Sequence, residues 1–389
     1  MDKRIYLDYA ATTPLASEVY ASMLDCFVAT FGNASSLHSF GREASEKLES
    51  SRAIIAKAIN AKPSEIYFTS GGTEANNWAL SGLAHANKAK GKHIIVSAFE
   101  HHSIMETASK LETEGFEISY IPITKKGIID YKELVKLIRP DTILISVMTV
   151  NNEVGTIQPI KAISKLAKSF GILFHTDCVQ ALGSVRLDVQ DMEIDALSVS
   201  AHKIYGPKGI GALYVRDGVR IEKIMFGGEQ ERNLRAGTSD VPSAVGFAKA
   251  AELLISHFND RSKTVLKLKK YFIKELMEKI PNIEINGSVN DSVGNIVNVS
   301  FGNIDGEAIV MLLDLAGIAV SNGAACASGS VKNSHVINAI NPKGSKSAVR
   351  FSLSYLTTFA DIDYTIEELK KAVENLRKVS PVKKPREAK

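Results

Sequence analysis

Apolar and β-branched residues form short runs along the first half of the chain, and amphipathic segments separate these runs. The runs are rich in Ile, Val, Phe and Tyr, and they predict strands at 65–70, 92–98, 116–123, 142–150, 171–177 and 194–201. The intervening segments have the apolar spacing of helices, at 74–90, 102–114, 130–138 and 159–169. This alternation predicts βαβ units, and therefore an α/β fold with a mostly parallel sheet that helices cover on both faces.

The pattern changes after about residue 240. A long stretch with helical apolar spacing occupies 243–279 and ends in "VLKLKKYFIKELMEKI". A smaller α+β region follows, with strands near 294–301 and 347–352 and a closing helix near 362–378.

This change predicts two domains. We expect a large domain at 16–256 and a smaller one formed by 1–15 together with 257–389. The first dozen residues are too short to be a domain and should pack against the second one. The sequence shows no internal repeat and no low-complexity linker, so the domains should dock closely.

The composition is that of a globular chain. Of its 389 residues, 45% are hydrophobic and 23% are charged, which allows sizeable cores and argues against disorder. The net charge of +4 is mild, and the basic tail "PVKKPREAK" is interpreted as a solvated end rather than a nucleic-acid arm. Three cysteines are too few for a disulfide framework and suit a reducing compartment.

Two further features bear on location. The beginning of the chain, "MDKRIYLDYAATT", lacks the apolar region of a secretory signal. No apolar run approaches the roughly 18 residues that a membrane helix needs. We therefore expect a cytoplasmic protein that associates neither with a membrane nor directly with nucleic acid.

Polar residues of interest follow the predicted strands, where ligands of open α/β sheets bind. After strand 65–70 comes "SGGTEANN", in which Gly71 and Gly72 permit a tight turn and Thr73 opens a helix. A helix start of this kind can bind phosphate through free N–H groups, although a threonine after glycines is more often only a cap.

The next strand ends carry further candidates. His101 and His102 follow strand 92–98; a metal site is one reading, but a surface or core histidine is the default, since no partners stand at metal spacing. Asn151 and Asn152 follow strand 142–150.

Asp177 and Gln180 follow strand 171–177. A carboxylate at the end of an apolar strand needs a partner, and a protonated ring nitrogen would serve.

Lys203 lies just after strand 194–201, in "SAHKIYGPKGIG". Most loop lysines are simply exposed, but a lysine in a cleft with a lowered pKa can form an imine. Each signal is ambiguous when taken singly. Together they combine a phosphate cradle, a carboxylate for a ring nitrogen, a stacking histidine and an imine-forming lysine, which is the set that pyridoxal 5′-phosphate requires.

Cys326 lies within "SNGAACASGSVKNS", residues 321–334, among small and turn-prone residues. A buried structural cysteine normally has larger apolar neighbours. The setting therefore argues against a simple packing role for this thiol.

Nearly the whole chain resembles the cysteine desulfurases of the NifS and IscS type, in the class V branch of the fold-type I pyridoxal-phosphate enzymes. The motifs that carry the resemblance occur in order: "YLDYAATTPL", "GNASSLHSFG", "SGGTEANN", "EHHS", "NNEVGTIQP", "HTDCVQALG", "SAHKIYGPKGIG", "GGEQERNLRAGT", "GAACASGS" and "RFSL". The resemblance implies a large domain with a mostly parallel sheet and a smaller α+β domain that carries the cysteine loop.

The resemblance also implies roles for individual residues. Lys203 would form the imine with the cofactor, His101 would stack on its ring, and Asp177 would pair with the ring nitrogen. The implied contacts to the rest of the cofactor come from Gly72, Thr73, Asn152, Gln180, Ser200 and His202. Asn152 and Arg350 would hold the carboxylate of the substrate, which a planar guanidinium binds bidentately.

For the sulfur, the resemblance implies that the Cys326 thiolate attacks L-cysteine and becomes a persulfide while L-alanine leaves. Lys203 and His101 would carry protons. The acceptor would be a protein such as an iron–sulfur scaffold of the IscU or NifU type, or a thiolation pathway for tRNA or a cofactor. No resident metal is implied, although Cys326 could ligate a transient iron–sulfur cluster. Thr238 would reach the cofactor of a second subunit, in a homodimer.

Cys178 and the segment after Cys326 depart from the expected pattern, and rival functions remain. Cys178 and Cys26 are interpreted as packing residues rather than sulfur carriers. The segment after Cys326 resembles the NifS subtype more than the IscS subtype. A selenocysteine lyase or a class V aminotransferase would use the same fold, and a catalytically inactive scaffold is the alternative outside enzymes.

Overall fold

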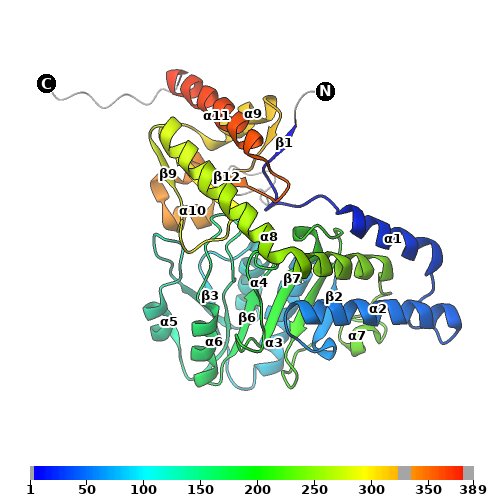
Figure 1. Ribbon diagram of the computed structural model, residues 1–389. Coiled ribbons are helices and arrows are strands. Elements are labelled where there is room, and N and C mark those ends of the chain that lie inside the picture. The colour runs from blue at the N-terminus through cyan, green and yellow to red at the C-terminus, as the bar shows by residue number, and fades with distance from the viewer. Residues whose placement is uncertain (1–3, 323–333, 380–389) are drawn as a thin grey trace.

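The computed structural model describes residues 4–322 and 334–379. Its largest element is a seven-stranded sheet (Figure 1). The strand order is β2 (Ile66–Thr69), β8 (Gly211–Val215), β7 (Ala196–Ser200), β6 (Leu173–Asp177), β5 (Thr142–Ser146), β3 (His93–Ser97) and β4 (Glu117–Ile121). Only β8 runs antiparallel to its neighbours. The predicted strands are thus confirmed, and β8 is an additional strand that the apolar pattern did not indicate.

Helices pack on both faces of this sheet, as predicted. Alternate residues of β3 show the two faces, because Ile94 and Val96 pack in a cluster with α3 and α4, whereas Ile95 packs in the large core on the other side. The helices in this part of the chain are α1 (Ser17–Ala29), α2 (Ser39–Ala58), α3 (Gly72–Asn87), α4 (His102–Thr113), α5 (Tyr131–Leu137), α6 (Ile160–Ser169) and α7 (Gln230–Asn233). Three short 3₁₀ turns occupy Pro63–Glu65, Ala201–Lys203 and Pro342–Ser347.

The second part of the structure surrounds a smaller sheet. Strands β12 (Ala348–Ser352), β10 (Ile296–Phe301) and β9 (Ile283–Ile285) pair antiparallel, and β1 (Ile5–Tyr6) pairs with β11 (Ile318–Ala319) in parallel. Helices α9 (Gly306–Leu315), α10 (His335–Ile340) and α11 (Phe359–Val379) belong to this part. Ile5 and Leu7 are buried in its core, whereas Ala10 belongs to the core around the large sheet. The assignment of 1–15 to the second domain therefore stays a prediction.

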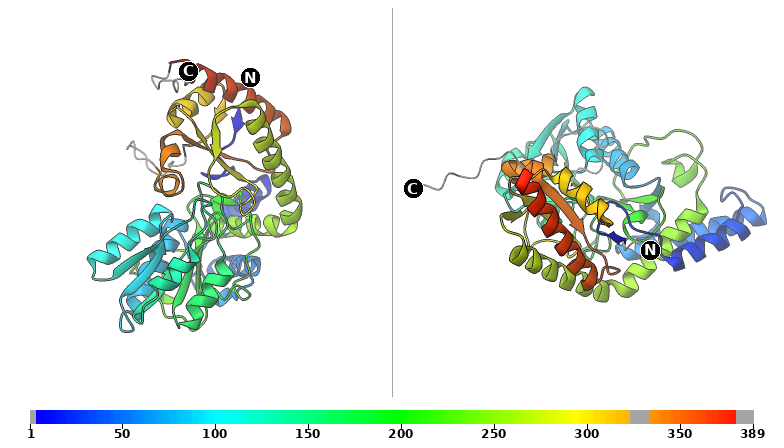
Figure 2. Two further views of the ribbon diagram at one scale, coloured as in Figure 1. Left: turned by 90° about the vertical axis from the view of Figure 1, so that its left-hand side faces the viewer. Right: turned by 90° about the horizontal axis from the view of Figure 1, so that it is seen from above.

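Helix α8 (Val241–Lys279) connects the two parts. Its N-terminal half contributes to the core of the large sheet, and its C-terminal half contributes Leu268, Phe272 and Leu276 to the core of the small one. Figure 2 shows this helix running along one side of both parts. The expected domain boundary after residue 256 therefore falls inside a continuous helix, and it stays a prediction. None of the helices in the described ranges is long and apolar enough to cross a membrane.

Candidate active site

One cavity of about 350 Å³ lies at the ends of the parallel strands, and Arg350 from β12 reaches it. Most of the residues singled out from the sequence line this cavity: Gly72, Thr73, His101, Asn152, Asp177, Gln180, Ser200, His202, Lys203 and Arg350. The ends of parallel strands meet at one edge of a sheet, which is why segments so far apart in sequence converge here.

The turn at the start of α3 allows another group to approach its backbone closely. Gly71 has a φ of +151°, and a Cβ on Gly72 would lie 2.5 Å from Cγ2 of Val179. Among the described residues no side chain caps the first turn of α3, and Gly72 and Thr73 of that turn line the cavity. The N-cap is Gly71, so the interpretation of Thr73 as a simple cap is wrong. Ser200 and His202 lie at the same corner, at the end of β7 and in the turn after it.

Asp177, at the end of β6, is only 4% exposed. Its carboxylate accepts hydrogen bonds from Nδ2 of Asn76, at 2.7 Å, and from the N–H of Val179, at 2.8 Å. A buried carboxylate held by two donors in an open cavity is suited to a cationic ligand group.

His101 is the N-cap of α4, and its ring is held on one side. The N–H of Ser103 donates to Nδ1 of His101 at 3.1 Å, which places the ring proton on Nε2. Burial lowers the pKa of His101, and the nearby Lys203 and His102 lower it further, against the opposing effect of Asp177. The ring is therefore neutral near pH 7, as a stacking group or a proton carrier should be.

Lys203 lies in the 3₁₀ turn after β7. Its Nζ donates to the carbonyl oxygen of Ala10 at 2.5 Å and to that of Ala11 at 2.7 Å. Nε2 of Gln180 also donates to the Ala10 oxygen, at 2.8 Å. The N-terminal segment thus holds two predicted cofactor contacts in place. The lowered pKa expected for Lys203 stays a prediction.

Arg350 is 3% exposed in its side chain. Its Nη2 lies 2.9 Å from Oδ1 of Asp8, and its Nη1 donates to the carbonyl oxygen of Asn152 at 2.9 Å. Asn152 therefore contacts Arg350 through its main chain. The two residues predicted to hold the substrate carboxylate do lie together, at the side of the cavity formed by β12.

Sequence reasoning missed two buried carboxyl groups that line the same cavity. Burial raises the pKa of Glu100 to about 8, and its Oε2 has no hydrogen-bond partner within 4–322 and 334–379. Burial raises the pKa of Glu153 to about 7, although a hydrogen bond from Ser334 and the charge of Arg350 oppose this. The available signal was an acidic residue next to a candidate within an apolar context, in "FEHHS" and "NNEVG".

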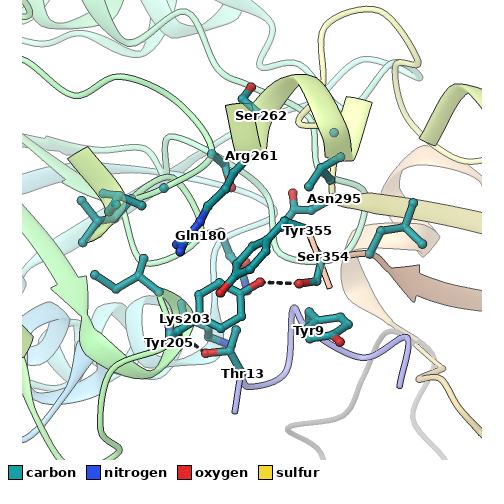
Figure 3. A pocket seen from close by; sticks show the side chains of 18 residues that line it. Tyr9, Thr13, Gln180, Lys203, Tyr205, Arg261, Ser262, Asn295, Ser354 and Tyr355 are labelled. Atoms are coloured by element: carbon teal, nitrogen blue, oxygen red, sulfur yellow. Dashed lines mark hydrogen bonds between the residues drawn. The ribbon is translucent and has the colours of Figure 1, made fainter. Parts of the chain in front are cut away.

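A second, smaller cavity of about 80 Å³ adjoins the first, and Gln180 and Lys203 line both. Figure 3 shows Thr13 of the N-terminal segment close to Lys203 and Tyr205, Tyr9 close to Ser354, and the hydrogen bond between Tyr205 and Ser354. The Tyr205 and Ser354 oxygens are 2.5 Å apart. The Tyr205–Ser354 contact thus joins the two parts of the structure next to Lys203.

Two predicted site residues, Thr238 and Cys326, lie elsewhere or cannot be placed. Thr238 is exposed and does not line the cavity. Cys326 lies outside the described residues, so its position relative to the cavity stays a prediction. Cys178 is fully buried next to Asp177, and burial raises its pKa to about 12. The described residues contain no group of three side chains able to hold a metal ion.

Comparison with known proteins identifies the class to which this fold and cavity belong. Residues 5–365 match the family described as Aminotransferase class-V. The chain is also 48% identical to the cysteine desulfurase IscS of Dictyoglomus turgidum, over 98% of both chains. It is 41% identical to the human cysteine desulfurase, over 97% of this chain and 83% of that one.

Solved structures agree with this result. A NifS-like protein superposes with a TM-score of 0.91 at 35% identity, over 96% of this chain and 100% of the other. SspA in complex with cysteine superposes with a TM-score of 0.81 at 37% identity, over 92% and 100% of the two chains. The chain therefore belongs to the cysteine desulfurases of the class V aminotransferase family, as the sequence motifs predicted.

Proposed function

We propose that the cavity binds pyridoxal 5′-phosphate and L-cysteine, and that the chain transfers the sulfur of L-cysteine to Cys326 with release of L-alanine. The observation that carries this proposal is the convergence of Lys203, Asp177, His101 and the start of α3 in one cavity. These groups come from four separate strand ends, and nothing in the packing of a sheet requires that combination of side chains.

The residues present fit this cofactor. The phosphate would bind at the start of α3, where a Cβ on Gly72 would fill the available space and where no side chain of the described residues caps the helix. Ser200 and His202 would add donors at that corner, and Gln180 would contact the phenolic oxygen. The bound cofactor would supply an electron sink next to the α-carbon of the amino acid.

Asp177 would keep a proton on the ring nitrogen of the cofactor. Its two hydrogen-bond donors fix the carboxylate. Because Asp177 is buried, little water would screen its attraction to the protonated ring nitrogen. The neutral ring of His101 would stack over the cofactor, with its proton on Nε2 and available for transfer. Lys203 would anchor the cofactor and then move the α-proton of the substrate through Nζ.

Substrate recognition would depend on Arg350 and Asn152. A guanidinium binds a carboxylate in two parallel hydrogen bonds, which orients the amino acid as well as holding it. The deep burial of Arg350 strengthens such a contact relative to one at the surface.

The sulfur step would need the substrate, one thiol and the electron sink of the bound cofactor, which would accept the electron pair of the broken carbon–sulfur bond until the carbon gains a proton. The Cys326 thiolate would attack the substrate sulfur, so that a sulfur–sulfur bond forms and the carbon–sulfur bond breaks. The substrate carbon would end as the methyl group of alanine after it gains a proton. Cys326 would then hold the persulfide until a protein acceptor, such as an iron–sulfur scaffold, takes the sulfur. A cytoplasmic location is part of this proposal.

The homodimer is also part of the proposal, and two observations support it. The large apolar side chains of α1 and the following segment are exposed, at Tyr20, Phe27, Val28, Phe31 and Leu37. A second copy would cover such a patch. Thr238, exposed and away from the cavity of its own chain, would reach the cofactor of the partner subunit.

Sedimentation at several concentrations tests the dimer, and cofactor retention by Thr238→Ala tests the shared contact. A monomeric active enzyme would contradict this part of the proposal. For the activity itself, Lys203→Ala should abolish both the visible absorbance of bound cofactor and alanine formation from L-cysteine. Full alanine formation by that variant would remove Lys203 from the proposed role.

A further inference from the structure

The N-terminal segment is fixed against β12 beside the cavity. The N–H of Ser352 donates to the carbonyl oxygen of Leu7 at 2.7 Å, and the N–H of Ala10 donates to Oγ of Ser352 at 2.9 Å. Asp8 lies between these contacts and forms a bridge with Ser352. The backbone on both sides of Asp8 is therefore tied to one residue of β12.

Arg350 lies two residues before Ser352 on the same strand, and its own backbone is also fixed. Arg350 and Ser321 exchange main-chain hydrogen bonds in both directions, at 2.6 and 3.2 Å. The guanidinium is held at two nitrogens, by Asp8 at 2.9 Å and by the Asn152 carbonyl at 2.9 Å. Asp8 therefore comes from a segment whose position is set by main-chain contacts with the strand that carries Arg350.

We propose that Asp8 is a positioning residue for substrate binding, which orients the Arg350 guanidinium toward the carboxylate of the incoming amino acid. This inference rests on the proposed role of Arg350. A guanidinium has two hydrogens on each terminal nitrogen. With one hydrogen of Nη1 on Asn152 and one of Nη2 on Asp8, the second hydrogen of each nitrogen remains for a bidentate carboxylate.

Asp8 is also the charged partner that makes this burial tolerable. An arginine that is 3% exposed would be costly without an ionised neighbour. The other carboxyl close to Arg350 is Glu153, and burial raises the pKa of that group to about 7. Glu153 is therefore partly protonated near neutral pH and is a weaker partner, which leaves Asp8 to fix the guanidinium.

The opposite role for Asp8 predicts an opposite result. If Asp8 competed with the substrate for Arg350, then its removal would strengthen substrate binding. If Asp8 positions Arg350, then its removal weakens substrate binding but leaves the chemical step almost unchanged, because Asp8 acts on the carboxylate end of the substrate.

The experiment compares steady-state alanine formation from L-cysteine by the holoenzyme and four variants. Asp8→Ala removes the ion pair, and Asp8→Asn keeps the oxygen but not the charge. Arg350→Lys tests the proposed function itself, and Asp314→Asn, at an exposed position on α9, is the matched control.

We expect Asp8→Ala to raise KM about ten-fold with kcat within about two-fold of the wild type. Asp8→Asn should give an intermediate KM, and Asp314→Asn should match the wild type. Thermal unfolding of each variant identifies any that fail to fold, and Asp8→Asn decides the question if Asp8→Ala does not fold.

An unchanged or lowered KM in both Asp8 variants, with a raised KM in Arg350→Lys, would overturn the positioning role alone. An equal fall in kcat and kcat/KM at unchanged KM would also overturn it. An unchanged KM in Arg350→Lys would instead contradict the proposed carboxylate contact on which the inference rests.

Discussion

Asn76 donates a hydrogen bond to the carboxylate of Asp177, across 2.7 Å and from a different element of the fold. Asn76 lies on the first turns of α3 and is 1% exposed, whereas Asp177 ends β6. The same amide nitrogen also donates to Oγ of Ser103, next to His101. One side chain therefore links the helix that would hold the phosphate to the groups that would contact the ring.

Replacing Asn76 with alanine should weaken cofactor binding. Asp177 would keep only the N–H of Val179 as a donor, and a hydrogen bond to a charged group contributes enough that its loss raises the dissociation constant about ten-fold or more. Titration of cofactor-free enzyme with pyridoxal 5′-phosphate, followed by absorbance, measures this. Asn259→Ala, at an exposed position on α8, is the control. An unchanged dissociation constant in Asn76→Ala would show that Asp177 does not depend on this contact.

Glu100 should make the stability of the fold depend on pH. Burial raises its pKa from 4.5 to about 8, so the folded chain holds a proton that the unfolded chain has lost across that window. The contribution of this proton to the free energy of unfolding is complete below the pKa of Glu100 in the unfolded chain. It is lost as pH rises through the pKa of Glu100 in the folded chain. Glu100→Gln resembles the protonated side chain at every pH. Its stability relative to the wild type should therefore improve as pH rises from 4.5 to about 8.

Urea unfolding of both proteins across this window measures the effect. Glu106→Gln, at an exposed position on α4, is the matched control and should show no such trend. A stability difference between Glu100→Gln and the wild type that stays constant with pH would mean that Glu100 is ionised in the folded chain.

The two cysteines that the structure describes should be unreactive in the folded protein. Burial raises the pKa of Cys178 to about 12, and Cys26 is also buried, with its pKa raised by burial. The thiolate is the reactive form, so both should react slowly with iodoacetamide near neutral pH. Peptide mass spectrometry after timed labelling, with urea-unfolded protein as the control, measures each site. Rapid labelling of Cys178 in the folded protein would contradict its interpretation as a packing residue.

The fold was largely predictable because its signals are local. The runs at 65–70 and 194–201, for example, have an apolar composition and are followed by turn residues. The long helix near 243–279 has helical apolar spacing along its own sequence. Strand β8 was missed because its segment, "GALYV", begins with small residues after a glycine-rich turn. What makes it a strand is pairing with β2 and β7, which no local pattern encodes.

The cavity was predictable only in part, for a related reason. Side chains with chemical character, such as Lys203 and Asp177, can be recognised from their type and their place after a strand. The carbonyl oxygens of Ala10 and Ala11 have no such signature, yet they hold Lys203. The raised pKa of Glu100 arises from burial by distant segments, so it becomes visible only in the folded chain.

The central claim is that Cys326 receives the sulfur of L-cysteine, and single-turnover alanine release tests it most directly. The cofactor-loaded enzyme is mixed with L-cysteine, and the masses of its cysteine-containing peptides are then measured. The proteins compared are the wild type, Cys326→Ala, Cys178→Ala and Cys26→Ala. We predict alanine release by all except Cys326→Ala, and a mass gain of about 32 Da, one sulfur atom, on the Cys326 peptide of the wild type. Normal alanine release without Cys326, or an added sulfur on Cys178 or Cys26 instead, would contradict the account.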